Sequence, residues 1–297
     1  MTEWRPMSDK TEELICKAPK DKVAFSKLLS RVLELGAAAL KYDALLEPKN
    51  RAFRFGITGP PGVGKSTLIG AIVGQLRVRG IGRIGILAID PTSPYSGGAV
   101  LGDRIRFAHL ATDPEVFIRS VGSRGAFGGL SAASFQMARA FDAAEFSLLM
   151  IETVGVGQGE YEIIHLADQV GVVLHTHGGD SIQLMKAGLL EVGNVMVVNK
   201  VDVGSPDSLV AELKEMRPEI AVFATSARDG QGIEPLVDWI ETQIRSGVSY
   251  EQRNRVQRLQ AEARFLFEMA VEQRWRNQVN AIVSSTDLRN LFQGISF

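Results

Sequence analysis

Short apolar runs recur along the middle of the chain and alternate with longer amphipathic stretches. Near-continuous apolar runs are typical of parallel strands that are buried on both faces, and the stretches between them have the length of helices. The pattern therefore predicts an α/β fold with a mostly parallel central sheet. The predicted strands are Phe53–Ile57, Ile84–Ile89, Leu148–Ile151, Val170–Leu174, Val195–Val198 and Ile220–Phe223.

Helical spacing of apolar residues marks both ends of the chain. It predicts one or two helices within residues 9–48, helices at Pro206–Met216 and Glu234–Arg245, and a long amphipathic helix outside the sheet from Tyr250 to about Gln278. We expect an N-terminal helical segment (1–48), a central domain (49–247) and a C-terminal helical arm (248–297). The predicted apolar stripe of the arm is Val256, Leu259, Ala263, Leu266, Phe267, Ala270 and Val271.

A P-loop motif lies between the first predicted strand and the helical run that follows it. Residues 59–66 read Gly-Pro-Pro-Gly-Val-Gly-Lys-Ser, which fits GxxxxGKS in its required strand–loop–helix context. The backbone N–H groups of Gly62, Val63 and Gly64 are expected to cradle phosphate oxygens, helped by the positive end of the next helix. Lys65 is the predicted charge for the β- and γ-phosphates, and the Ser66 hydroxyl is the predicted Mg²⁺ ligand.

A second motif, Asn199-Lys200-Val201-Asp202, follows the predicted strand Val195–Val198. The Asp202 carboxylate accepts hydrogen bonds, and guanine offers two donors, N1–H and the 2-amino group, where adenine offers neither. The segment Thr225-Ser226-Ala227 follows the next strand and fits a loop that backs the guanine base. Together with the P-loop, these motifs favour GTP over ATP.

Three acidic residues are candidates for the Mg²⁺ side of the site. Glu152 ends one predicted strand, Asp90 ends another, and Asp103 lies between them in sequence. The carboxyl ends of parallel strands share one edge of the sheet, so these carboxylates can converge. Glu152 can serve the ion directly or through water, and Gly155 lets a backbone N–H approach the γ-phosphate. The alternative for any single acid is a solvated or capping role.

Composition narrows the class of protein. The chain is 45% hydrophobic, which suffices for a sizeable core. Its net charge of −1 gives no sign of the excess of basic residues that is typical of nucleic-acid-binding proteins, so no nucleic-acid partner is expected. No apolar run approaches the roughly 18 residues of a membrane span, so no membrane partner is expected. The first residues have no apolar signal core, and we expect a cytoplasmic protein. The single cysteine, Cys16, excludes an intrachain disulfide and a multi-cysteine metal site.

Four segments together resemble one family. GPPGVGKST at 59–67, AIDPTSPYSGGAVLGDR at 88–104, ETVGVGQGE at 152–160 and NKVD at 199–202 are similar to the MeaB/MMAA (ArgK-like) G proteins. The family consists of GTPase chaperones of adenosylcobalamin-dependent acyl-CoA mutases such as methylmalonyl-CoA mutase. The resemblance implies a P-loop NTPase fold of the SIMIBI class, GTP/GDP and Mg²⁺ as cofactors, and such a mutase as partner. A cobalamin adenosyltransferase and a homodimer through the arm are further implied partners.

The resemblance also implies roles for the matching residues. Lys65, Ser66 and Thr67 would bind phosphates and Mg²⁺; Asp90, Asp103 and Glu152 would surround Mg²⁺ and the attacking water; Asn199, Lys200 and Asp202 would hold guanine. The implied switch segments are Ser96–Gly129, Val154–Tyr161 and His175–Lys186. No pair of a finger arginine and a water-orienting glutamine stands out, so we expect slow intrinsic GTP hydrolysis that the mutase stimulates.

Two rival functions stay open on sequence grounds. A metallochaperone GTPase of the nickel-insertion type would need a Cys/His-rich site, and the single cysteine argues against it. His175 and His177 could face one metal, but we favour a polar strand end. An ATP-dependent kinase linked to amino-acid transport is disfavoured by the Asn-Lys-Val-Asp motif.

Overall fold

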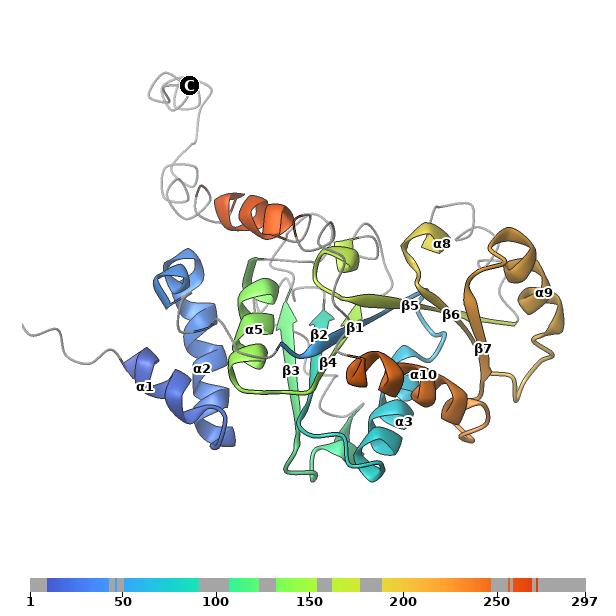
Figure 1. Ribbon diagram of the computed structural model, residues 1–297, viewed down its shortest axis with the longest axis horizontal. Helices are drawn as coiled ribbons and strands as arrows, with labels where there is room; N and C mark the ends of the chain where they lie inside the picture. Colours follow the sequence, from blue (N-terminus) through green and yellow to red (C-terminus); the bar gives the residue numbers. More distant parts are fainter. Residues whose placement is uncertain are drawn as a thin grey trace, which may run out of the picture.

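A single parallel sheet forms the centre of the molecule (Figure 1). The computed structural model describes residues 10–42, 46, 51–90, 107–122, 132–153, 162–176, 189–246, 256, 259–268 and 271. Within these residues seven strands pair in the order β3-β2-β4-β1-β5-β6-β7, all in parallel. Their bounds are β1 Phe53–Thr58, β2 Ile84–Asp90, β3 Val116–Gly122, β4 Leu148–Thr153, β5 Gln169–His175, β6 Val195–Asn199 and β7 Ala221–Thr225.

The parallel α/β sheet and its six predicted strands are confirmed, and β3 is an addition to them. This strand lies at one edge of the sheet, where Ile118, Arg119 and Ser120 are only half-buried. An edge strand pairs with a neighbouring strand on one side only, so its residues can be less buried than those of inner strands, and it needs no continuous apolar run. Arg119 and Ser120 therefore interrupt the pattern from which strands were predicted. The segment Ser96–Gly129, assigned by resemblance to the first switch, thus contains a strand of the sheet.

Helices cover both faces of the sheet and pack into two apolar clusters. One cluster joins the sheet to α3 and α10, and the other joins its opposite face to α2, α5 and α9. Among the described residues, no helix has the length and apolar character to cross a bilayer. The helix bounds are α1 Lys10–Lys17, α2 Lys22–Leu35, η1 Gly36–Tyr42, α3 Lys65–Val78, η2 Ala108–Leu110, α5 Ala132–Ala143, η3 Ile163–His165, α8 Leu189–Val192, α9 Asp207–Met216 and α10 Ile233–Arg245.

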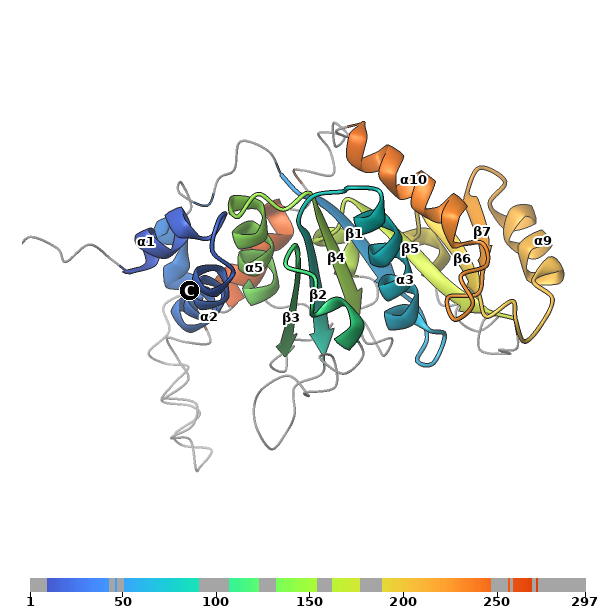
Figure 2. The same ribbon diagram turned by 90° about the horizontal axis from the view of Figure 1, so that it is seen from below.

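The predicted N-terminal helices are α1 and α2. Helix α2 packs beside α5 at the β3 end of the sheet, and α1 packs on α2 (Figures 1 and 2). The Asp21 carboxylate caps α2 by accepting hydrogen bonds from the backbone N–H groups of Val23 and Ala24, and these bonds hold the pKa of the carboxyl below its usual value. Phe25 of α2 contacts the rings of Phe117 and Phe141, with centroids 4.7 and 4.9 Å away. The N-terminal helices therefore share their core with the sheet.

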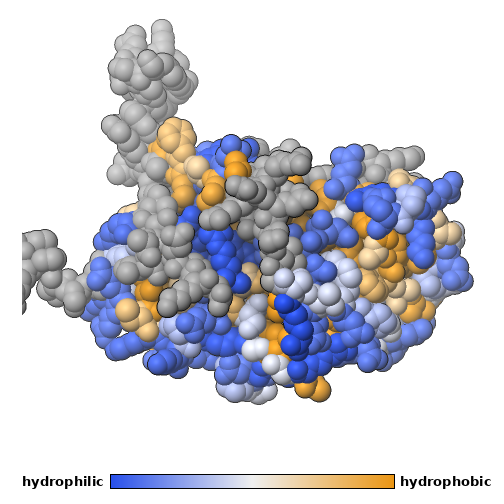
Figure 3. Space-filling view, viewed as in Figure 1, coloured by the Kyte–Doolittle hydropathy of each residue, from blue (hydrophilic) through white to orange (hydrophobic). Residues whose placement is uncertain are grey.

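The described part of the C-terminal arm is helical and packs on α5. Phe265 contacts the ring of Phe135, and Glu262, only 8% exposed, pairs with Arg139 at 2.7 Å. The predicted apolar stripe of the arm is buried only in part: Leu266 is buried, whereas Leu259 and Phe267 are exposed. Hydrophobic surface is visible on this helix in Figure 3. The contacts with α5 decide which face of the arm is buried. This face includes Glu262 and Phe265, which are not part of the predicted apolar stripe.

Candidate functional site

The P-loop connects β1 to α3, and two of its glycines leave no room for a side chain. Gly59 has φ 139°, and a Cβ on it would lie 2.2 Å from the carbonyl oxygen of Val173 in β5. Gly64 has φ 95° and precedes the first residue of α3, and a Cβ on it would lie 2.6 Å from Asn199 Nδ2. Both positions combine a left-handed backbone with close approach of another element, which glycine tolerates. The loop can thus lie directly against β5 and β6.

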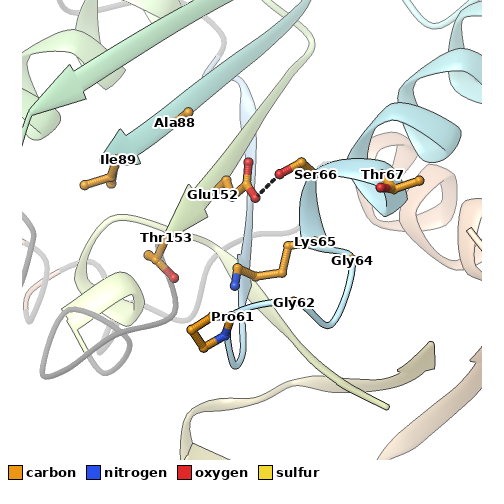
Figure 4. A pocket seen from close by; sticks show the side chains of 10 residues that line it. All are labelled: Pro61, Gly62, Gly64, Lys65, Ser66, Thr67, Ala88, Ile89, Glu152 and Thr153. Carbon is orange, nitrogen blue, oxygen red and sulfur yellow. Dashed lines mark hydrogen bonds between the residues drawn. The ribbon is translucent and has the colours of Figure 1, made fainter. Parts of the chain in front are cut away.

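The loop borders a cavity of about 400 Å³, a size suited to a nucleotide's phosphates (Figure 4). Lys65 is 7% exposed, and its Nζ donates hydrogen bonds to the carbonyl oxygens of Gly59 and Pro60, at 2.7 and 3.0 Å. The N-terminus of α3 opens onto the same cavity and contributes partial positive charge. The cavity is lined by Pro61, Gly62, Gly64, Lys65, Ser66, Thr67, Ala88, Ile89, Glu152 and Thr153.

Two of the predicted Mg²⁺ ligands meet at the edge of this cavity. Ser66 Oγ donates a hydrogen bond to Glu152 Oε1 at 2.6 Å (Figure 4). Glu152 is buried near the end of β4, while Ser66 lies in the first turn of α3. A hydroxyl and a carboxylate are hard oxygen donors of the kind that Mg²⁺ prefers beside phosphates. The residues present therefore fit a magnesium ion at this point.

The other predicted phosphate-side residues are placed only in part. Asp90 is the last residue of β2, whose register pairs Ile89 with Thr153 of β4, so its backbone lies at the same sheet edge as Glu152. The side chain of Asp90 lies outside the described part of the structure. Asp103 and Gly155 lie outside the described residues altogether, so their convergence on the site stays a prediction.

The base-side motif is held by the amide of Asn199 at the end of β6. Its Nδ2 donates to the carbonyl oxygen of Val63 at 2.8 Å. Its Oδ1 accepts from Thr225 Oγ1 at 3.1 Å and from the backbone N–H of Ala227 at 3.0 Å. Asn199 is 2% exposed, so these bonds form away from solvent. One side chain thus joins the P-loop, β6 and the loop after β7.

The predicted guanine reader, Asp202, lies in the loop after β6. Ser226 Oγ lies 3.0 Å from Asp202 Oδ1 and 3.1 Å from Asp229 Oδ2, and it can donate to either carboxylate. Lys200, between Asn199 and Asp202, has a positive φ of 66°, which is uncommon for a residue with a side chain. The structure thus brings the predicted residues of the base side together in one set of contacts.

The sequence placed Thr225 in the loop that backs the base, but it did not predict the bond from Thr225 to Asn199 or the part of Asp229 in this network. Thr225 is the neighbour of Asn199 in the register between β6 and β7, and Asp229 follows Ser226 by three residues. The signal for the bond between Thr225 and Asn199 was that both residues lie just after the ends of consecutive predicted strands, which can be neighbours in a parallel sheet. The signal for Asp229 was its position three residues after Ser226, a separation that suits a hydrogen-bonded turn.

The fold and these residues together define the class of P-loop GTPases. The glycine loop connects β1 to α3, Lys65 borders the cavity, and the Asn-Lys-Val-Asp motif begins at the last residue of β6. The chain belongs to the MeaB family, because the family described as "Methylmalonyl Co-A mutase-associated GTPase MeaB" matches residues 34–282.

Individual relatives agree with this assignment. A protein of Pyrococcus horikoshii that is named as a GTPase is 40% identical over 243 residues, which cover 77% of this chain and 76% of that protein. The mitochondrial methylmalonic aciduria type A homolog of Mus musculus is 33% identical over 223 residues, which cover 71% of this chain and 53% of that protein. The crystal structure of LAO/AO transport system kinase aligns with a TM-score of 0.65 and 22% identity, covering 97% of this chain and 98% of that one. At this identity the structural match shows the fold alone.

Proposed function

We propose that this protein is a GTP-hydrolysing chaperone that gates cofactor loading and protects an adenosylcobalamin-dependent acyl-CoA mutase of the methylmalonyl-CoA mutase type. The observation that carries the proposal is the family match over residues 34–282, whose description names that mutase. The contacts of the P-loop and of Asn199 support guanine nucleotide as the ligand that drives the cycle.

At the phosphate side, Lys65 would neutralise the β- and γ-phosphates, and Thr67 and the backbone of residues 62–64 would contact them. Ser66 and Glu152 would hold Mg²⁺, joined by Asp90 and Asp103. This proposal is supported by the hydrogen bond between Ser66 and Glu152 and by the cavity that Lys65 borders. A bound Mg²⁺ would supply charge neutralisation of the phosphate oxygens.

At the base side, Asp202 would accept the N1–H and 2-amino donors of guanine. Asn199, Lys200, Ser226 and Ala227 would shape the pocket around the base. The contact between Ser226 and Asp202 supports this role, because it orients the carboxylate that reads the base.

The reaction would be in-line attack by water on the γ-phosphate, giving GDP and phosphate. In such a reaction positioning and electrostatic stabilisation supply nearly all of the rate. Glu152 would help to place the water, and the backbone N–H of Gly155 would orient the γ-phosphate. We propose slow intrinsic hydrolysis that the partner mutase accelerates.

Further partners belong to the same proposal. A cobalamin adenosyltransferase would deliver the cofactor, and the cytoplasm would be the site of action. The arm would also support a homodimer, because its described helix leaves large apolar residues exposed on the side away from α5. These exposed residues are Val256, Leu259, Phe267 and Val271.

The test is GTP turnover by the purified protein with and without a cobalamin-dependent acyl-CoA mutase encoded nearby. We expect a slow basal rate and stimulation of several-fold or more by the mutase, with an unrelated protein at equal concentration as control. Intact GTP binding without stimulation by any such mutase would contradict the proposal, and stoichiometric metal binding in a titration would then favour a metallochaperone. A phosphorylated protein formed from ATP would instead favour a kinase.

A further inference from the structure

Two buried threonine hydroxyls connect the last residues of β1 and β4. Thr153 Oγ1 donates a hydrogen bond to Thr58 Oγ1 at 3.0 Å. Thr58 is 0% exposed and Thr153 is 4% exposed, so water does not compete for this bond. Neither hydroxyl is among the residues that the sequence motifs assign to the nucleotide.

This bond links the end of β1, where the P-loop begins, to the end of β4, which carries Glu152. The register between β1 and β4 runs from Phe53↔Leu148 to Ile57↔Glu152, and the threonine pair is one residue beyond it. The P-loop begins at the residue after Thr58. Gly155, which is proposed to contact the γ-phosphate, is two residues after Thr153. The bond therefore joins the two strands at the end of the sheet from which the P-loop leaves β1.

A second bond fixes the end of β4 from its other face. Successive residues of a strand point to opposite faces of the sheet, so Glu152 and Thr153 face opposite ways. Glu152 accepts its hydrogen bond from Ser66 on the α3 side, while Thr153 bonds to Thr58 on the other side. A rotation of the strand end about its axis would break one of the two bonds. Together they hold Glu152 and the chain that follows it in one orientation.

Packing alone does not require hydroxyls here. Two valines have nearly the same shape as two threonines, and replacing both partners of a buried hydrogen bond by apolar groups of the same shape can be nearly neutral for stability. Replacing one partner is different, because it leaves the other hydroxyl buried and unpaired. The pair therefore permits an experiment that separates a role in stability from a role in the reaction.

We propose that Thr58 and Thr153 are positioning residues that hold the end of β4 against the start of the P-loop, and so set the placement of Glu152 beside the proposed γ-phosphate site. This inference rests on the proposed GTP hydrolysis. Misplacement of a reacting group by 1 Å can slow a reaction by about a hundredfold, so a loosened strand end is expected to lower the rate of the chemical step more than nucleotide affinity.

The experiment compares Thr58→Val, Thr153→Val, the double variant and Thr153→Ser with the unaltered protein. Thermal unfolding, single-turnover GTP hydrolysis, and the Kd values of GDP and of a non-hydrolysable GTP analogue are measured for each. Thr11→Val is the matched control, because Thr11 is also buried and accepts a hydrogen bond from Arg31 Nε in the N-terminal helices. Its unfolding temperature can change, but its rate of hydrolysis should not.

We expect both single valine variants to unfold at lower temperature and the double variant to recover most of that loss. The hydrolysis rate of the double variant should stay about tenfold low with KM for GTP nearly unchanged, and Thr153→Ser should keep most of the rate. A double variant that regains both stability and rate would overturn the proposal and leave the pair a packing feature.

Failure of the proposed function would be recognised separately, as a lack of hydrolysis in the unaltered protein with and without a mutase. The binding measurements then decide the inference. We expect the Mg²⁺ concentration needed for half-maximal binding of the GTP analogue to rise about tenfold in the double variant, since Glu152 is proposed to hold that ion. An unchanged Mg²⁺ requirement would overturn the inference.

Discussion

The two sides of the predicted nucleotide site differ in how their polar groups are bonded. On the phosphate side, Lys65 donates to carbonyl oxygens of its own loop, and Ser66 donates to Glu152. On the base side, Asn199 bonds to three other elements through one buried amide. Each phosphate-side bond has a predicted ligand of phosphate or Mg²⁺ as its donor, whereas the Asn199 bonds use both ends of one buried amide to connect other elements.

This difference distinguishes side chains that would change their hydrogen-bond partners when nucleotide and Mg²⁺ bind from side chains that would keep them. Lys65, Ser66 and Glu152 each give up a protein contact when they take up their proposed roles, so substitutions there should affect the reaction more than the fold. Asn199 keeps its contacts in the proposed complex, so substitutions around it should lower stability and base affinity together. Four substitutions test this contrast.

Lys65→Ala should have the largest effect on the reaction. It removes the charge that neutralises the β- and γ-phosphates, and loss of one such stabilising group typically lowers the catalytic rate by about 10²–10³-fold. Single-turnover hydrolysis of GTP measures this loss. Lys27→Ala on the exposed side of α2 is the control, and it should leave the rate unchanged. A Lys65→Ala protein that hydrolyses GTP at the unaltered rate would show that another group supplies this charge.

Glu152→Gln should lower the rate by about a hundredfold and raise the Mg²⁺ concentration needed for half-maximal hydrolysis. The amide oxygen can still accept the hydrogen bond from Ser66, but the negative charge that favours a divalent cation is gone. Turnover measured across a range of Mg²⁺ concentrations separates the two effects. An unchanged Mg²⁺ requirement would mean that Glu152 acts on water or on Ser66 rather than on the ion.

The elements that the sequence predicted well have strong local signals. The P-loop is recognisable because its glycines, Lys65 and Ser66 lie close together in the chain. The five inner strands are recognisable because burial on both faces demands continuous apolar runs, and β7 at the other edge has such a run although it is mostly half-buried. The edge strand β3 lacks that demand, since Arg119 and Ser120 lie in it half-exposed. The base motif was predictable because Asn199 and Asp202 are close in sequence and follow a strand.

The remaining features depend on which elements meet in space. The arm buries Glu262 because Arg139 of α5 lies opposite it, and no periodicity along the arm contains that information. The contacts of Thr225 with Asn199 and of Thr153 with Thr58 follow from strand order and register, which place partners from distant parts of the chain side by side. A sequence pattern indicates which residues of one helix or strand are buried. It does not indicate which two elements pack together, and these bonds depend on that packing.

Asp202→Asn should weaken GTP binding and relax discrimination toward xanthine nucleotide. A bidentate contact to a base is worth roughly 1–3 kcal/mol, so the Kd for GTP should rise about 10- to 100-fold while the Kd for xanthosine triphosphate falls. Thermal unfolding without nucleotide should be almost unchanged, because Asp202 is exposed. Binding titrations with both nucleotides measure the change. If GTP affinity stays the same, Asp202 does not read the base.

Thr225→Val should have the smallest effect and should appear in stability as well as in binding. The hydroxyl of this fully buried residue donates to Asn199 Oδ1, and Asn199 keeps its bond to the Ala227 N–H after the substitution. We expect a loss of about 1 kcal/mol in the free energy of unfolding and a rise of a few-fold in the Kd for GTP. The hydrolysis rate at saturating GTP should be unchanged.

Thr242→Val is the matched control, because its hydroxyl donates to the carbonyl oxygen of Asp238 on the exposed surface of α10. It should change neither stability nor affinity by a measurable amount. A Thr225→Val protein with a lowered rate at saturating GTP would break the contrast between the two sides, since a base-side bond would then reach the reacting phosphate. The path would run through the bond from Asn199 to the carbonyl oxygen of Val63 in the P-loop.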